Sequence, residues 1–255
     1  MVAVFCLRLA LGMMACLLAL PNSQAPPRFY RVHFLTSLGL TGVALAFTGE
    51  RSDPLFISAF AVLLLVLFFG SVVWHLEGAP QGRAAIILAS VCLATTLVWM
   101  RFGGFYELST VQQMHLLGLV GDDFSSALVL GAATTAMLIG HSYLIASGMS
   151  MTPLLRMLLV LAASLVVRAI LSGIGLWLWT EVTPEPFSET ETMLWLAVRW
   201  LLGIIAPLVL GWMAWETAQI RSTQSATGIL YVVVIVSFLG ELTGQLLFDK
   251  TGYIL

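Results

Sequence analysis

The feature that most constrains this chain is a series of long apolar runs, separated by clusters of proline, glycine and charged residues. A bilayer with a hydrocarbon core about 30 Å thick requires roughly 20 apolar residues per helix. Eight runs meet that length, and none alternates as a barrel strand would. They lie near residues 2–20, 30–48, 54–76, 83–101, 124–146, 154–179, 193–215 and 226–247. The sequence therefore predicts an all-α polytopic transmembrane helical bundle of about eight spans, forming one domain over residues 1–255.

Composition excludes the soluble classes of protein. Of the 255 residues, 60% are hydrophobic and only 9% are charged, whereas a soluble domain carries roughly a quarter charged residues. The formal net charge is −2 and Lys250 is the one lysine, so no basic stripe is present for nucleic acid. The three cysteines lie in apolar runs without metal-site spacing. The expected partners are therefore membrane lipid and other membrane subunits.

Loop charges predict the orientation. An even number of spans places both termini on one side of the membrane. The loop from 180 to 192 carries four glutamates and no basic residue, and cytoplasmic loops are usually rich in Lys and Arg. We therefore expect both termini outside. The first run could alternatively be a signal peptide, because Ser23-Gln24-Ala25 resembles a cleavage site, but Arg8 lies within the run and favours a retained helix.

Six ionisable side chains remain at membrane depth once the loops are set aside. A charge at the centre of a helix costs at least about 2.5 to 3.5 kcal/mol on insertion scales, so each needs a partner or water. Three lie on the terminal side of mid-membrane or near it, and three histidines lie in the other half. They are Arg168, Arg199, Glu241, His33, His75 and His141.

Glu241 is the sharpest site candidate. Gln245 follows it by four residues and shares its helix face, and the neighbouring Gly240 and Gly244 permit close helix approach. A buried glutamate needs a basic partner, which Arg168 or Arg199 can supply. The group is a candidate quinone-binding or proton-handling site. An ion pair that only holds helices together is the alternative, and it stays open.

The histidines raise the question of a haem b, because two imidazoles on facing helices can ligate iron. His33 and His75 lie within about a turn of the expected membrane surface. His141 lies deeper, and no histidine of matching depth is evident as its partner. We predict that His141 bonds across helices and does not bind haem. A direct role in quinone or proton chemistry remains the other interpretation.

Three further features predict local structure. Ala132, Ala136 and Gly140 recur every four residues, which predicts close packing of a neighbouring helix. Pro207 predicts a kink about a turn beyond Gly203. Residues 110–119 are expected to form either a short helix along the terminal-side surface or a solvent loop.

The predicted topology and the last span resemble the membrane anchor subunits of dimethyl sulfoxide reductase type molybdoenzymes, the DmsC and NrfD-like group. Gly240-Glu241, Gly244-Gln245 and Phe248 carry the likeness, with Gln245 and Asp249 where the family usually has Arg and Tyr. The resemblance implies a subunit that binds menaquinol or ubiquinol near the outer face. It also implies an iron–sulfur partner and no haem in this chain.

The leading hypothesis is an integral subunit of a multi-subunit redox complex in a bacterial inner (cytoplasmic) membrane. It would interact with quinone and anchor an iron–sulfur or haem-bearing redox subunit. No metal site or catalytic residue of its own is expected. Two alternatives stay open: a structural membrane subunit of a larger cofactor-bearing assembly, and a small-molecule or proton-coupled transporter.

Overall fold

A computed structural model shows the described part of the chain to be helical throughout, which confirms the predicted all-α class. The structure describes residues 1–21, 25–49, 54–76, 81–102, 110–145, 150–183 and 189–255, without the side chains of 102, 110–117 and 145. Glu77, Glu185 at the centre of the acidic loop, and the Ser23-Gln24 pair lie outside these ranges.

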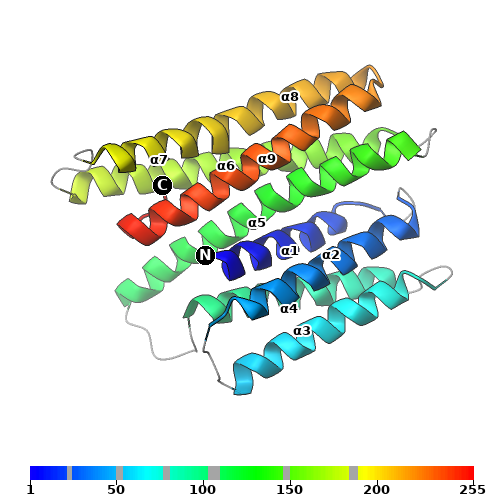
Figure 1. Ribbon diagram of the computed structural model, residues 1–255, viewed down its shortest axis with the longest axis horizontal. Coiled ribbons are helices and arrows are strands. Elements are labelled where there is room, and N and C mark those ends of the chain that lie inside the picture. Colours follow the sequence, from blue (N-terminus) through cyan, green and yellow to red (C-terminus); the bar gives the residue numbers. More distant parts are fainter. Residues whose placement is uncertain (22–24, 50–53, 77–80, 103–109, 146–149, 184–188) are drawn as a thin grey trace.

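The described helices lie side by side along the length of the molecule, with the first and last residues near the same end (Figure 1). We call that end the terminal face. The bounds are α1 Val2–Leu18, α2 Pro27–Ala46, α3 Pro54–Val73, α4 Gly82–Phe102, α5 Thr110–Ile145, α6 Thr152–Val182, α7 Thr190–Trp200, η1 Leu201–Ile205, α8 Ala206–Gln219 and α9 Thr223–Thr251. Prolines begin several of them, since the first turn needs no N–H partner, and Gly252 ends α9 with a φ of 77°.

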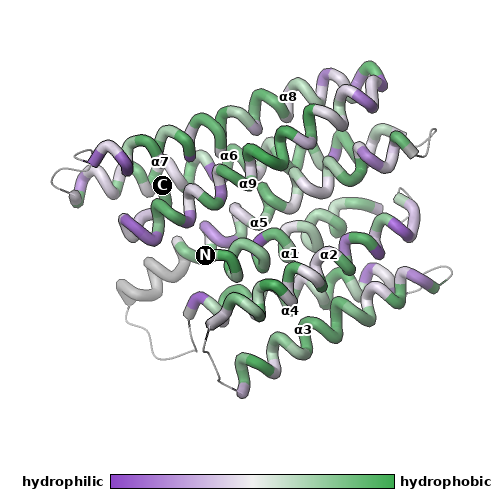
Figure 2. The backbone as a smooth tube through the Cα atoms, viewed as in Figure 1, coloured by the Kyte–Doolittle hydropathy of each residue, from purple (hydrophilic) through white to green (hydrophobic). Residues whose placement is uncertain are grey.

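Six of these elements are long and apolar enough to cross a membrane, so the chain is a multi-pass membrane protein by its helices. They are α3, α4, residues Gly118–Leu144 of α5, α6, the continuous rod of α7, η1 and α8, and α9. The 17-residue α1 is shorter, and α2 carries Arg28, Arg31, His33 and other polar residues. Hydrophobic residues cover the middle of most helices, and hydrophilic ones gather toward their ends (Figure 2).

The bundle consists of two rings of four helices. In the first ring α1 packs on α2, α2 on α3, α3 on α4, and α4 back on α1. The second ring repeats this order with α5, α6, the α7–η1–α8 rod and α9. Packing of α1 against α5 joins the two rings, and α1 is therefore buried on nearly every side. This repeat of arrangement was not evident in the sequence.

Glycines set the two closest helix crossings. At the α1–α5 crossing, a Cβ on Gly131 would lie 2.0 Å from the backbone carbon of Gly12. At the second crossing, a Cβ on Gly240 of α9 would lie 2.1 Å from the Cα of Gly203 in η1. Gly140 likewise meets Thr227 of α9, which confirms the close packing predicted for the small-residue stripe of α5. Only residues without a side chain allow these backbones to meet.

One expectation about local structure was wrong, and the kink expected near Pro207 stays a prediction. Residues 110–119 form neither a separate surface helix nor a loop, because α5 runs without interruption from Thr110 to Ile145. The rod around Pro207 accommodates the proline through the π-helical turn of η1 immediately before it. A π turn absorbs one extra residue, and such turns are frequent at functional sites. The same turn carries Gly203 to its contact with Gly240.

Candidate functional site: a chain of buried charges

Seven ionised side chains form one line of alternating charge across the seam between the two rings. Positive and negative members follow one another through direct salt bridges. The line draws on α4, α5, α1, α6, α9 and α7, and we call it the charged chain. Its order is Arg101, Asp123, Arg8, Asp122, Arg168, Glu241 and Arg199.

Glu241 lies in the second ring between two arginines. Arg168 donates from Nε and Nη2 to the two carboxylate oxygens, at 3.1 and 2.9 Å. Arg199 donates from Nη1 to Oε1 at 3.0 Å. The basic partner expected for Glu241 is therefore confirmed, and both candidate arginines supply it. The role of these residues in quinone or proton chemistry stays a prediction.

Glycines make room for Arg199. A Cβ on Gly244 would lie 3.1 Å from Nε of Arg199, and one on Gly203 would lie 3.2 Å from its Nη1. Arg199 also donates to the backbone oxygens of Gly240 and Leu255, each at 3.1 Å, and to Ser172 at 3.3 Å. The guanidinium is fully buried and its donors are used. The glycines noted around Glu241 in the sequence thus serve both helix approach and the fit of this side chain.

The aspartates of α5 join the two rings. Asp122 accepts from Arg8 of the first ring and from Arg168 of the second. Asp123 accepts from Arg8 Nε at 2.8 Å and from Arg101 at 3.1 to 3.3 Å. Arg8 also reaches Ser126. Two consecutive residues on one helix therefore hold arginines from three others.

The charged chain contains four arginines and three side-chain carboxylates, and Arg199 at its end also donates to an oxygen of Leu255. Six of the seven residues are at least 95% buried, and the side chain of Arg101 is 17% exposed. Burying ions costs several kcal/mol each, which only close pairing can offset. The alternating order meets that need, because every interior member has an opposite charge on both sides.

Gln245 lies one turn beyond Glu241 toward the terminal face, on the same side of α9. The side chain is buried, yet neither its amide nitrogen nor its amide oxygen has a hydrogen-bond partner among the described residues. It lines a cavity of about 30 Å³ with mainly polar walls. Arg8, Arg101 and Asp122 of the charged chain line the same cavity, as do Met1, Val4, Phe248 and Asp249.

The histidines lie apart from this site and from one another. His33, expected near the surface, is fully buried, and it contacts Phe29 O at 2.9 Å through Nδ1 and Thr135 Oγ1 at 3.2 Å through Nε2. His141, expected to be the deepest, is exposed. Its Nδ1 lies 3.3 Å from the hydroxyl of Tyr231 on α9, so the predicted bond across helices is confirmed. His75 contacts Arg31.

Sequence reasoning missed four members of the charged chain. Asp122 and Asp123 lie just before the predicted span near 124–146, because two adjacent carboxylates interrupt the apolar pattern. Arg101 ends the predicted span near 83–101, and Arg8 lies within the first run, where it served only to favour a retained helix. The available signal was the number of buried cations: Arg8, Arg168 and Arg199 need more than one glutamate as a partner.

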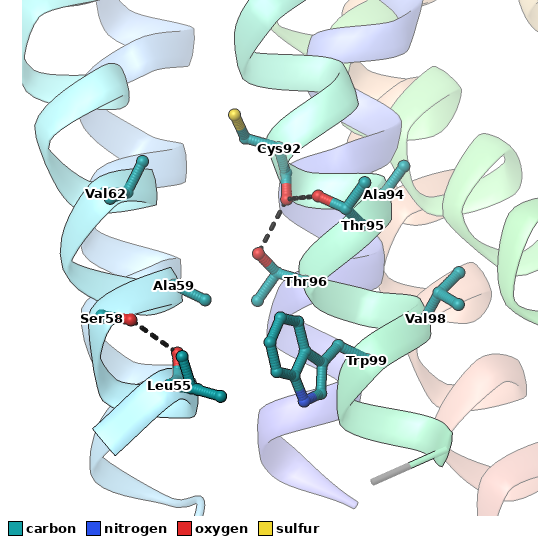
Figure 3. A pocket seen from close by; sticks show the side chains of 10 residues that line it. All are labelled: Leu55, Ser58, Ala59, Val62, Cys92, Ala94, Thr95, Thr96, Val98 and Trp99. Atoms are coloured by element: carbon teal, nitrogen blue, oxygen red, sulfur yellow. Dashed lines mark hydrogen bonds between the residues drawn. The ribbon is translucent and has the colours of Figure 1, made fainter. Parts of the chain in front are cut away.

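A larger cavity lies elsewhere, in a groove of about 640 Å³ between α3 and α4. Leu55, Ala59 and Val62 of α3 face Cys92, Thr95 and Trp99 of α4 across it (Figure 3). The groove is open and apolar, and its hydroxyls bond to their own helix. It offers shape to an alkyl chain but no polar group to recognise a head group. The small polar cavity is therefore the better candidate for chemistry.

No family model, curated protein or solved structure matches the chain.

Proposed function

We propose that the chain is an integral membrane subunit of a redox complex that binds a quinone beside the charged chain. In this proposal all eight members of the two rings, including α1 and α2, cross a bacterial inner membrane, and the terminal face lies outside. An iron–sulfur or haem-bearing subunit would dock at that face and exchange electrons with menaquinone or ubiquinone. The observation that carries the proposal is the unpaired amide of Gln245 beside the arginines of the charged chain.

The donors and acceptors at the cavity suit both redox states of such a ligand. A quinone presents carbonyl oxygens, which accept hydrogen bonds, and a quinol presents hydroxyls, which also donate them. The amide of Gln245 can donate through Nε2 and accept through Oε1. Arg8 and Arg101 add donors, and Asp122 adds an acceptor. The cavity is smaller than a quinone ring, so the head group would lie at its mouth.

The charge of the site supports the same proposal. Electron transfer to a quinone places negative charge on its oxygens before protons arrive. Arg8 and Arg101 at the cavity, held in place by buried pairing, would stabilise that charge in surroundings of low dielectric. Asp249 at the cavity wall is exposed at the terminal face, where water and salt screen it.

A structural subunit is the second candidate, and the complete pairing of Glu241 favours it. Both carboxylate oxygens accept hydrogen bonds from arginines, and the residue is fully buried. A ligand could not contact Glu241 without displacing an arginine. Glu241 would then hold α6, α7 and α9 together, and under either proposal it acts on a ligand only through its partners.

The test measures quinol oxidation or reduction by the purified complex at matched amounts of assembled protein. Gln245→Leu is close in size but removes the amide, so the quinone proposal expects turnover to fall at least about tenfold, the equivalent of one lost hydrogen bond of about 1.4 kcal/mol. Gln219→Leu makes the same change at an exposed position, the last residue of α8, at the end of the bundle opposite the terminal face. That control should keep full turnover.

Conservative changes in the charged chain separate the two candidates. Glu241→Gln keeps the shape and removes the charge, and Arg199→Lys keeps the charge and loses the planar donors. The quinone proposal expects lower turnover in both variants with assembly retained. Normal turnover in Gln245→Leu, Glu241→Gln and Arg199→Lys together would refute it and favour the structural subunit. A partner that carries iron–sulfur clusters or haem should co-purify under either outcome.

A further inference from the structure

The cavity beside Gln245 has an unusual combination of burial and unmet polarity. Gln245 is 94% buried, and both polar atoms of its amide lack a partner among the described residues. Buried polar atoms in native proteins nearly always have a partner, either protein or ordered water. Arg8, Arg101 and Asp122 line the cavity with Gln245, but their hydrogen bonds go to other residues. The neighbouring helices present an open space to the Gln245 amide and no bonded side chain. No described residue therefore supplies the missing partner, and the cavity is the space in which it would lie.

The size of the cavity decides which partner fits. One water needs roughly 10 to 15 Å³ of cavity volume and two to four polar contacts. The cavity of about 30 Å³ therefore has room for two waters, with Gln245, Asp122 and two arginines as contacts. An aromatic ring or a polyatomic anion would not fit.

We propose that this cavity is a hydration site for two ordered water molecules, and that these waters carry protons from a ligand at the cavity mouth to the terminal face. One water would accept from Gln245 Nε2, and a second would donate to Gln245 Oε1 or to Asp122. Asp249 lies on the wall of the same cavity and is exposed to solvent. The two waters would therefore connect the buried carboxylate of Asp122 to the surface at Asp249. The path needs no second opening in the protein.

The proton role rests on the proposed function, whereas the hydration site does not. Oxidation of a quinol at the cavity mouth releases two electrons and two protons. The electrons would pass to an iron–sulfur or haem group of the partner subunit. Each proton would pass from a quinol hydroxyl to a cavity water, and then from water to water to the terminal face. No residue of the charged chain has to change its protonation, so its ion pairs can stay intact.

Hydration is tested on the full chain in nanodiscs by solid-state NMR, through polarisation transfer from water protons to the ¹⁵N-labelled side-chain amide of Gln245. Gln245→Leu identifies the signal by removing it. Val4→Ile adds a methylene to the cavity wall, and Val2→Ile makes the same change at an exposed position on α1. We expect fast transfer in the native chain and in Val2→Ile, and a several-fold slower transfer in Val4→Ile. No transfer in the native chain would overturn the hydration site.

The proton role is tested on the purified complex by quinol turnover in H₂O and D₂O. Val4→Ile should lower kcat several-fold, raise the solvent isotope effect and leave KM for quinol unchanged, because it obstructs water and not the head group. Val2→Ile should behave as the native complex. An unchanged kcat and isotope effect in Val4→Ile would overturn the proton role. A complex without quinol activity would overturn the proposed function and the proton role together, and the NMR experiment would still decide the hydration site.

Discussion

The two rings meet through two polar contacts of different kinds. Near the terminal face, the charged chain joins them through Arg8 of α1 and the aspartates of α5. Deeper along the same seam, His33 of α2 meets Thr135 of α5 through one hydrogen bond of 3.2 Å. Thr135 follows Asp123 by 12 residues, about 18 Å along the helix. One contact is a network of ions, and the other is a single neutral pair.

The difference lies in what each contact loses when one member is removed. A neutral pair leaves behind a hydroxyl that can bond to its own helix, as the hydroxyl of the adjacent Thr134 does with Leu130 O. An interior arginine leaves two carboxylates facing each other in an apolar interior. The charged chain is therefore stable only as a whole, whereas the His33 contact can be lost alone.

The largest effect is expected from Arg168→Met. Arg168 bridges Asp122 and Glu241 at the middle of the charged chain and is 2% exposed. Removing one partner of a buried ion pair typically costs about 3 to 5 kcal/mol, a large part of the stability of an ordinary domain. We expect a much lower melting temperature in detergent and loss of the monodisperse peak in size-exclusion chromatography.

Arg101→Met is the matched control for that prediction. It makes the same change at the partly exposed end of the chain, where Arg101 also lies over the ring of Phe248 at 5.6 Å. Its loss of stability should be clearly smaller, because water can reach the carboxylate left behind. The double variant Arg168→Met with Glu241→Gln should be less stable than Arg168→Met alone, because it also takes the carboxylate partner from the buried Arg199. Equal effects at Arg101 and Arg168 would contradict the view that position in the chain sets the cost.

Gly131→Ala tests the apolar part of the seam between the two polar contacts. The added methyl would lie 2.0 to 2.4 Å from the backbone of Gly12, so α1 and α5 must separate. Overpacking usually costs about 1 to 3 kcal/mol, and a backbone contact places this variant at the upper end. Gly228→Ala in α9 is the control, because nothing lies within 4 Å of its added methyl. That variant should gain up to about 1 kcal/mol from helix propensity.

Much of this fold could be predicted from the sequence, because apolar length is a property of each run alone. The spans near 54–76 and 226–247 overlap α3 and α9 closely. The extent of α5 could not be predicted, because Asp122 and Asp123 are costly in a helix until Arg8, Arg101 and Arg168 surround them. Those partners are 22 to 115 residues away in the chain, so no local pattern reveals them.

Only the part of the candidate site that lies in the second ring could be predicted from the sequence. Glu241, Arg168 and Arg199 stand out because each is a charge within an apolar run, and Gln245 follows from helical spacing. The exposure of the histidines could not be predicted, because distance from a helix end does not determine which way a side chain faces. His33 faces α5 at the centre of the molecule, and His141 faces outward on α5. The packing partners of a helix decide which of its side chains point inward, and only the three-dimensional structure shows those partners.

His33→Leu should lower the stability of the protein less than Arg168→Met or Gly131→Ala does. It removes the bond to Thr135 and leaves Thr135 free to bond within α5, so the expected loss is about 1 kcal/mol. Thr135→Val should cost a similar amount. In the double variant the two losses should be less than additive, as expected for two residues that bond to each other. Full additivity in thermal melts would show that the contact does not contribute to holding the rings together.

The smallest effect is expected from an ion pair outside the bundle interior. Lys250 at the end of α9 lies 2.7 Å from Glu189 and 3.6 Å from Glu191, and both glutamates are exposed. Hydrogen bonds from Lys250 and Thr192 lower the pKa of Glu189 below its ordinary value of 4.5. A carboxylate with a lowered pKa stabilises the folded state above its unfolded pKa, and this contribution disappears as the pH falls through the folded pKa. Lys250→Met should therefore melt at a slightly lower temperature than the native protein at pH 7. The difference should shrink as the pH falls below about 4.5. Salt at pH 7 should reduce it in the same way, because exposed pairs are screened. A difference that persists in acid and in high salt would mean that Lys250 acts through packing of its alkyl chain, and the contrast between exposed and buried pairs in this molecule would then rest on the charged chain alone.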